Sequence, residues 1–250
     1  MREQLKRVPG LVLTVRAARR GRVTARRSAE DARFALARRR RQGRIEEYLR
    51  THPVRRLQLG TGSNPYHGWL NTDVVDYRRR NEVVYLDARE PFPLPDNAFD
   101  TAFSEHMIEH LTYADGMLCL RECHRVLRPD GRLRIATPSL RRIAALYAEE
   151  LTDLQRRYLA WATGAFVKHS DIALPGFVLN NIARNFEHKF VYDEETLRHV
   201  LAVIGFVEIT EWPVGESADP ALTGLERHMR SAAEFNAYET LVLEARKPRA

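Results

Sequence analysis

The sequence predicts an α/β protein with a doubly wound, mostly parallel sheet of seven strands, preceded by a basic helical extension. An apolar strand at 56–59 runs into a glycine-rich turn, and further short apolar segments recur up to residue 136. Two of these segments end in acids, Asp73 and Asp87. Carboxylates beyond neighbouring strand ends can hold a ribose and a base at the crevice of such a sheet. The sequence therefore predicts a nucleotide-type cofactor.

The remaining elements complete this sheet. Predicted strands lie at 56–59, 70–75, 83–86, 100–104, 132–136, 206–211 and 238–245, and predicted helices at 28–41, 44–50, 113–127, 139–150, 151–163 and 194–204. Asp193 is expected to cap the last helix and Gly205 to end it. Residues 164–190 show no clear period and are expected to form a loop or lid. We expect residues 1–52 to be the extension and 53–250 the main domain, with 150–190 as a substrate-covering insertion.

The connection after the glycine turn is unusually short. Thirteen positions separate Gly60 from Asp73, whereas dinucleotide folds usually have about 20 before the corresponding acid. Pro65 and Gly68 also interrupt the segment. We therefore expect one helical turn or none between 62 and 69, and we expect residues 43–50 to cover the exposed face instead.

The most specific motifs lie in residues 82–138. They read VVYLDA at 83–88, PFPLPDNAFD at 91–100, EHMIEHL at 105–111 and ECHRVLRPDGRL at 122–133. These segments resemble class I S-adenosylmethionine-dependent methyltransferases, in particular the small-molecule, methyltransferase type 11-like branch. The resemblance covers about 55–140 well and 190–245 loosely. It implies a Rossmann-like fold whose final strand is antiparallel.

The resemblance also implies a cofactor, S-adenosyl-L-methionine, and a set of residues that hold it. The set is Gly60, Gly62, Ser63, Asn64, Asp73, Asp87, Ala88, Ser104 and Glu105. The glycine turn would lie under the methionine and ribose, Asp73 would accept from the ribose hydroxyls, and Asp87 would read the adenine edge. Two positions depart from the pattern, because Gln58 replaces a usual acid and Asn64 a usual glycine. Asn64 can still adopt left-handed backbone geometry.

Two histidines are candidates for the catalytic base. A hydroxyl nucleophile benefits from a base whose pKa lies near neutrality, which favours histidine. By resemblance, His106 borders the sulfonium end and His188 lies on a segment that folds over the cleft. We favour His188, because a covering segment reaches the acceptor. His106 to His110 also matches the H-x-x-E-H zinc pattern, but within this block we do not expect zinc hydrolysis, and methyl transfer requires no metal.

Positive charge is concentrated at the N-terminus. Residues 1–56 hold 18 Arg and Lys against five Asp and Glu, although the whole chain is only +7. Such a tract can meet an anionic membrane surface, or it can be a solvated arm. Nucleic acid is not favoured, because the tract lacks the interleaved rings that stack on bases.

Composition sets the remaining expectations. No apolar run approaches the ~18–20 residues of a membrane span, and Cys119 and Cys123 are expected to be small buried hydrophobes in a reducing cytoplasm. The expected activity is methyl transfer to a small-molecule or glycan acceptor, with a hydroxyl as the expected acceptor group. One alternative is a non-catalytic protein or scaffold that binds the adenosyl cofactor. A second, an NAD-linked oxidoreductase, is disfavoured because a pyrophosphate needs a helix N-terminus at the glycine turn. The oligomeric state is not predicted.

Overall fold

The computed structural model describes residues 35–74 and 82–249. By its contacts the chain divides into two units, Met1–Arg44 and Ile45–Ala250. In the first unit the described residues, 35–44, are helical. The rest of the predicted basic extension, including the helix expected from residue 28, lies outside the described residues.

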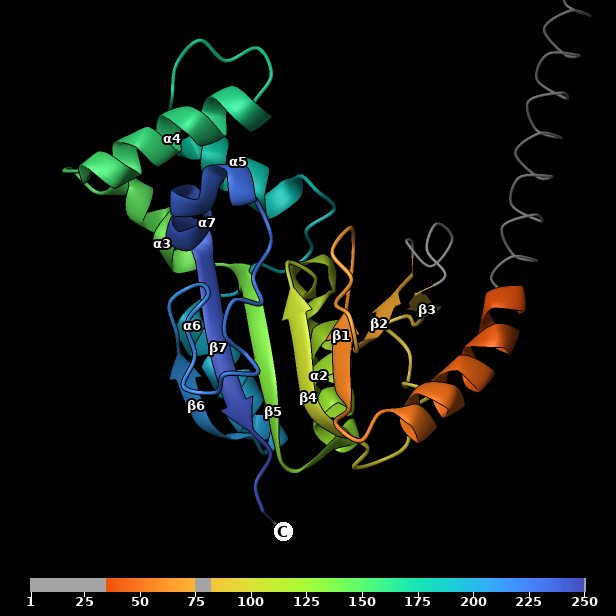
Figure 1. The fold of residues 1–250 in the computed structure, drawn as a ribbon. Coiled ribbons are helices and arrows are strands. Elements are labelled where there is room, and N and C mark those ends of the chain that lie inside the picture. Colours follow the sequence, from red (N-terminus) through yellow and green to blue (C-terminus); the bar gives the residue numbers. More distant parts are fainter. Residues whose placement is uncertain (1–34, 75–81, 250) are drawn as a thin grey trace, which may run out of the picture. The chain divides into compact units, whose positions relative to one another are not determined.

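The second unit is built on a seven-stranded sheet of order β3-β2-β1-β4-β5-β7-β6 (Figure 1). The strands are β1 Arg56–Leu59, β2 Leu70–Asp73, β3 Val83–Tyr85, β4 Phe99–Glu105, β5 Leu127–Pro138, β6 Val207–Glu211 and β7 Thr240–Arg246. β1 to β5 are parallel, and β7 runs antiparallel between β5 and β6. The predicted sheet and its antiparallel last strand are therefore confirmed.

One face of the sheet packs against two helices, α2 (Tyr113–Val126) and α6 (Glu194–Ile204). Residues in register across the strands, such as Leu57 and Ala102, share the core with Leu120 and Leu201 from these helices. The predicted termini of α6 are confirmed. Asp193 caps its first turn by accepting from a backbone N–H, and Gly205 ends it with a φ of 109°.

The segment between the glycine turn and β2 contains no helix, as its length predicts. The helical residues 45–51 cover this part of the molecule instead. The Tyr48 hydroxyl lies 3.2 Å from the carbonyl oxygen of Gly68, and its ring stacks 6.3 Å from that of Phe99. Ile45 is buried in the same core.

The opposite face of the sheet is polar, and loops cover it. Phe103 packs there with Tyr66, Trp69, Leu222 and Leu225, which come from the segment before β2 and from the segment before α7. On the same face, Arg134 of β5 lies directly opposite Phe103, and Glu244 of β7 lies opposite Arg134, so charged groups enter the interior. Each group must find a partner, because burying an unpaired charge is costly.

The partners surround Arg134 of β5. Its guanidinium is fully buried and lies 2.6 Å from Glu226 of the covering loop and 2.5 Å from Glu244 of β7. The loop is therefore held on the sheet by an ion pair as well as by apolar contacts.

A helical cap stands above the carboxyl ends of the parallel strands (Figure 1). It consists of α3 (Leu140–Ala144), α4 (Asp153–Phe166), α5 (Pro175–Arg184) and α7 (Ala233–Glu239), with a core of its own. The expectation of a loop over 164–190 is wrong for α5, whose proline at its first turn is pre-organised for a helix. The helix expected over 139–150 ends early, at Ala144, and continues as a 3₁₀ turn (Ala145–Tyr147). Further 3₁₀ turns are Ile108–His110 and Arg230–Ala232.

Two expectations came from composition, one about the cysteines and one about membrane-spanning segments. Cys119 and Cys123 are free and buried on α2, as predicted. No helix in the described ranges is long and apolar enough to cross a membrane.

The buried ion pairs of Arg134 generate a stability prediction. Arg134→Met should lower the free energy of unfolding by about 3–5 kcal/mol, because it leaves two carboxylates buried without a cation. Urea denaturation measures this. The matched control is Arg128→Met on the same strand, whose partly exposed pair with Asp100 should contribute below about 1 kcal/mol. Equal losses from the two variants would contradict the assignment.

Candidate active site

Two cavities lie side by side at the carboxyl ends of the strands. The strand-end cavity, about 590 Å³, is bordered by the ends of β1, β2 and β3. The cap cavity, about 440 Å³, lies between β1, β4 and the helices of the cap. Both are lined by Gly60, Gly62, His106 and His110, so the two spaces meet at the glycine turn and the end of β4.

The glycine turn is shaped as the sequence predicts. Gly60 and Gly62 have φ values of 65° and 51°, which favour glycine. A Cβ atom at Gly60 would lie 2.4 Å from Cγ of Met107. The backbone N–H of Gly62 donates to the Asp73 carboxylate at 3.0 Å, which ties the turn to the end of β2. Asn64 does not use left-handed geometry, since its φ is not positive, so the tolerance argued from sequence is not needed.

The side chain of Gln58, which stands where an acid is usual, has one hydrogen-bonded end and one unpaired end. Its side-chain N–H donates to the carbonyl of Asn64 at 3.0 Å. Its Oε1 is buried and has no hydrogen-bond partner among the described residues, although Gln58 lines the cap cavity. A buried acceptor without a donor is costly unless a ligand supplies one. An N–H of a bound molecule would satisfy it.

Asp87 and Ala88 line the strand-end cavity, where the resemblance places the adenine. The Asp87 carboxylate also accepts from Arg89, from the guanidinium at 2.9 and 2.7 Å and from the backbone N–H at 3.0 Å. Sequence reasoning missed Arg89. Its position two residues after the acid was the available signal, because short side chains often bond locally to the backbone there.

Ser104 and Glu105, which the resemblance places at the sulfonium end, differ in their access to the cavities. Ser104 is buried and lines neither cavity. Glu105 lines the cap cavity alone, together with Ser63 and Asn64. Its carboxylate accepts the backbone N–H groups of Arg227 and His228, each at 2.7 Å. Burial raises the pKa of Glu105, and its evident role is to fasten the covering loop to the sheet.

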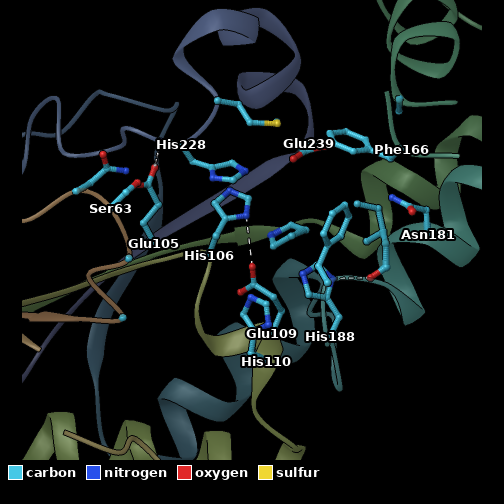
Figure 2. A pocket seen from close by; sticks show the side chains of 18 of the residues that line it. Ser63, Glu105, His106, Glu109, His110, Phe166, Asn181, His188, His228 and Glu239 are labelled. Atoms are coloured by element: carbon cyan, nitrogen blue, oxygen red, sulfur yellow. Dashed lines mark hydrogen bonds and ion pairs between the residues drawn. The ribbon is translucent and has the colours of Figure 1, made fainter. Parts of the chain in front are cut away.

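His106 is held tightly at the junction of the two cavities. Its φ of 46° is strained for a residue with a side chain. Nδ1 lies 3.3 Å from the Glu109 carboxylate, Nε2 lies 3.3 Å from the Thr240 hydroxyl, and the ring stacks on His228 at 4.0 Å (Figure 2). Burial opposes a charge on this ring, but Glu109 outweighs burial and raises the pKa of His106. Both ring nitrogens are therefore engaged.

His188 has the opposite environment on the far side of the cap cavity (Figure 2). Its Nδ1 donates to the carbonyl of Ile182 at 2.6 Å, since a carbonyl oxygen can only accept. This fixes the tautomer and leaves Nε2 as the proton acceptor. Burial lowers the pKa of His188, which keeps the ring neutral near pH 7. The ring contacts His110 at 4.9 Å.

The segment that carries His188 is anchored to the sheet end. The backbone N–H groups of Lys189 and Phe190 donate to the carbonyl of Glu109. Phe186 and Glu187 both have positive φ values, 57° and 64°. Two such residues in succession form a sharp turn, which holds His188 toward the cavity at some cost in strain.

Three carboxylates in the cap cavity belong to this site, and sequence reasoning singled out only Glu105. Glu109 is fully buried and accepts from the Thr137 hydroxyl at 3.0 Å. Glu239 accepts from the Tyr158 hydroxyl at 2.6 Å. Glu109 could have been found from its spacing of three residues after His106. Glu239 comes from the last helix, and no local pattern marks it.

Two sets of three side chains lie close enough to share a metal ion, namely His106, His228 and Glu239, and Glu109, His110 and His188. We assign a metal to neither, because His106 and Glu109, one from each set, already form an ion pair at 3.3 Å.

The cofactor that the resemblance implies fits this geometry. The strand-end cavity offers Asp73 and Asp87 to hydroxyl and amine donors, and its walls at Leu86 and Leu111 are apolar. Beyond the glycine turn, the buried Oε1 of Gln58 can accept from the ammonium of a methionine group. An uncharged acceptor is sufficient there, since a hydrogen bond to a charged donor contributes about 1.5–3 kcal/mol.

Asp73 supports a direct test of cofactor binding. Asp73→Ala should weaken binding of S-adenosylhomocysteine by about 10- to 100-fold, because a charge-assisted hydrogen bond to the ribose is lost. Isothermal titration calorimetry measures this. Asp96→Ala is the control, since Asp96 is exposed and lines neither cavity. Tight NAD binding without S-adenosylhomocysteine binding would contradict the cofactor assignment.

Comparisons with known proteins bear on the same residues. Residues 57–135 match the family model described as a methyltransferase domain. A comparison with curated proteins finds no match.

Several solved structures are similar. An S-adenosylmethionine-dependent methyltransferase from Mesorhizobium loti is 19% identical, with 78% of this chain and 91% of that chain covered and a TM-score of 0.47. A methyltransferase from Archaeoglobus fulgidus is 17% identical, with 82% and 92% covered and a TM-score of 0.47. Phosphoethanolamine N-methyltransferase 2 from Haemonchus contortus is 14% identical, with 83% of this chain covered and a TM-score of 0.42. The chain spans about half, 53%, of the length of that enzyme.

The matched residues contain the glycine turn, Asp73, Asp87 and His106, and they form five parallel strands of the sheet. The part of the chain that holds these residues is therefore similar to a methyltransferase domain, and this agrees with S-adenosyl-L-methionine as the cofactor.

Proposed function

We propose that this protein transfers a methyl group from S-adenosylmethionine to a hydroxyl of a small-molecule or glycan acceptor bound in the cap cavity. The observation that carries the proposal is His188. Its fixed Nδ1 leaves Nε2 to accept a proton, and it lines the same cavity as the glycine turn. A base so placed suits an oxygen nucleophile, which must lose a proton as it attacks.

S-adenosylmethionine, when bound, supplies a methyl group on an activated sulfonium. The chain then has to hold the acceptor oxygen in line with that methyl group and take up its proton, and such positioning can lower a barrier by several kcal/mol or more. The apolar walls at Phe166, Val178 and Ile182 exclude water from the cavity. His188 takes the proton of the acceptor hydroxyl at Nε2.

His106 serves a different role in this proposal. Its two ring nitrogens already face Glu109 and Thr240, so it has no nitrogen left to accept a proton from the acceptor. It lines both cavities, and this position suits a residue that borders the cofactor and the transferred group.

Replacing the base tests this assignment. His188→Ala should reduce turnover of an accepted hydroxyl substrate by about 10²–10⁴-fold, because general-base catalysis contributes that much. Binding of S-adenosylhomocysteine should be unchanged within about twofold. His199→Ala, an exposed histidine of α6 that lines neither cavity, is the control. If His106→Ala abolished turnover while His188→Ala did not, the roles would be reversed.

The pKa values of His188 and His106 should also differ. Burial favours the neutral ring of His188, so its pKa should lie below the ordinary 6.5, whereas Glu109 should hold that of His106 above it. A proton-accepting role therefore persists as the pH falls to 6.5 and is lost only below it. NMR titration of the imidazole resonances, with His188→Gln and His106→Gln for assignment, measures both values without a substrate. The reverse order of titration would contradict the proposed base.

The alternative is a protein that binds the adenosyl cofactor without catalysis. The uncharged Gln58 and the short connection before β2 favour it. Its expected signature is intact S-adenosylhomocysteine binding with no methyl transfer to any hydroxyl compound that binds in the cap cavity. Contact of the basic arm with an anionic membrane surface is a separate proposal, and it rests on the charge of residues 1–56 alone.

A further inference from the structure

We infer that the acceptor carries a protonated amine, and that the Glu239 carboxylate binds this ammonium group in the cap cavity. The inference rests on the proposed function and specifies its substrate class. It follows from the charges, the hydrogen bonds and the walls of the cavity.

The described side chains that line the cap cavity are rich in acids and contain no lysine or arginine. The lining includes three carboxylates, Glu105, Glu109 and Glu239, with four histidines, His106, His110, His188 and His228. Burial lowers the pKa of His228 to about 4 and also lowers that of His188, so these two rings are neutral at pH 7. His106 is the ring that Glu109 favours as a cation. Negative charge therefore exceeds positive charge in this lining.

Each of the three acids has a different set of partners. Glu105 accepts two backbone N–H groups, and Glu109 faces His106 and Thr137. Glu239 is only 5% exposed, and its Oε2 accepts from the Tyr158 hydroxyl. Its Oε1 has no hydrogen-bond partner among the described residues. Glu239 is thus a buried carboxylate with an oxygen available to a ligand.

The buried carboxylate of Glu239 would be stabilised by a cation. Removing a charge from water without a partner is expensive, and burial accordingly raises the pKa of Glu239. Glu109 and Glu239 lie on different sides of His106 (Figure 2), and His106 already pairs with Glu109 at 3.3 Å. A ring nitrogen of His106 also lies within 4.8 Å of a Glu239 oxygen, but no hydrogen bond joins them. Since no lysine or arginine among the described residues pairs with Glu239, an ammonium of the ligand would supply a cation of its own.

The neighbouring walls suit an organic ammonium better than a hydrated ion. Tyr158, Phe166 and Phe186 contribute aromatic rings to the same cavity, and Ala162 and Ile182 are apolar. A ligand cation near an aromatic face gains additional attraction, and apolar walls bury the carbon skeleton that carries it. The same acids repel carboxylate and phosphate groups. The lining therefore selects a cationic acceptor over a neutral one and disfavours an anionic one.

Three phenols that differ in charge test the inference. Tyramine is a cation, 4-ethylphenol is neutral and 4-hydroxyphenylacetate is an anion, and all three present the same hydroxyl. Binding to the full chain saturated with S-adenosylhomocysteine is measured by calorimetry at pH 7.5 with a chelator present. Tyramine should bind at least about 10-fold more tightly than 4-ethylphenol, and 4-hydroxyphenylacetate should bind most weakly.

Glu239→Gln should abolish the preference for tyramine over 4-ethylphenol and leave S-adenosylhomocysteine binding unchanged. Glu234→Gln is the matched control, because Glu234 lies on the same helix and pairs with Arg157 at the surface; it should keep the preference. Tyr158→Phe keeps the cavity shape and should retain most of it.

Several results would overturn the inference. They are equal binding of the three phenols, a preference that survives Glu239→Gln, binding of none of the three, and tight binding of Mn²⁺ alone with no amine preference. Methyl transfer is scored separately. A Glu239-dependent amine preference without methyl transfer would support the inference and contradict the proposed function. Methyl transfer to 4-ethylphenol without an amine preference would support the proposed function and contradict the inference.

Discussion

The site depends on one buried residue, Glu109, which connects three parts of the chain. Its carboxylate holds His106 at the end of β4 and accepts from Thr137 of β5. Its backbone carbonyl accepts from Lys189 and so anchors the segment that carries His188. A buried carboxylate is tolerated only when its partners are in place. The geometry of both histidines is therefore coupled to the charge state and position of this one side chain.

The second constraint is the short connection after the glycine turn. Without a helix there, the helical residues 45–51 pack into the core on the side of α2 and α6. The loop that Arg134 and Glu226 hold down covers the opposite face of the sheet. The same loop carries His228, which Glu105 fastens beside His106. The loop therefore covers the polar face of the sheet and also forms a wall of the cap cavity. S-adenosylmethionine has no phosphate, so the lost helix N-terminus removes no ligand contact that the cofactor needs.

Local patterns predicted much of this fold and part of the site. Strand ends, the cap of α6 and the helix-free segment before β2 follow from apolar runs, Asp193 and chain length, and each is local in sequence. The polar interactions that complete the site join residues far apart in the chain, such as Tyr158 with Glu239 and His106 with Thr240. No spacing rule brings such pairs together, because tertiary packing decides them. The helix α5 was missed for a related reason, since its apolar stripe has a partner only within the cap.

The contrast between the two histidines shows how one cavity can assign different roles to the same side chain. His106 is strained, stacked and paired with an acid, so its ring is fixed and its proton is retained. His188 donates one proton to a carbonyl, and burial lowers the pKa of its ring, so its second nitrogen stays free to accept a proton. Environments that push two titratable groups apart are how a single site provides a fixed charge and a proton acceptor at the same pH. Glu239 adds a third environment, a buried carboxylate that lines the same cavity and accepts from Tyr158. In the function proposed here, recognition of substrate charge and proton transfer would therefore depend on different residues of one cavity.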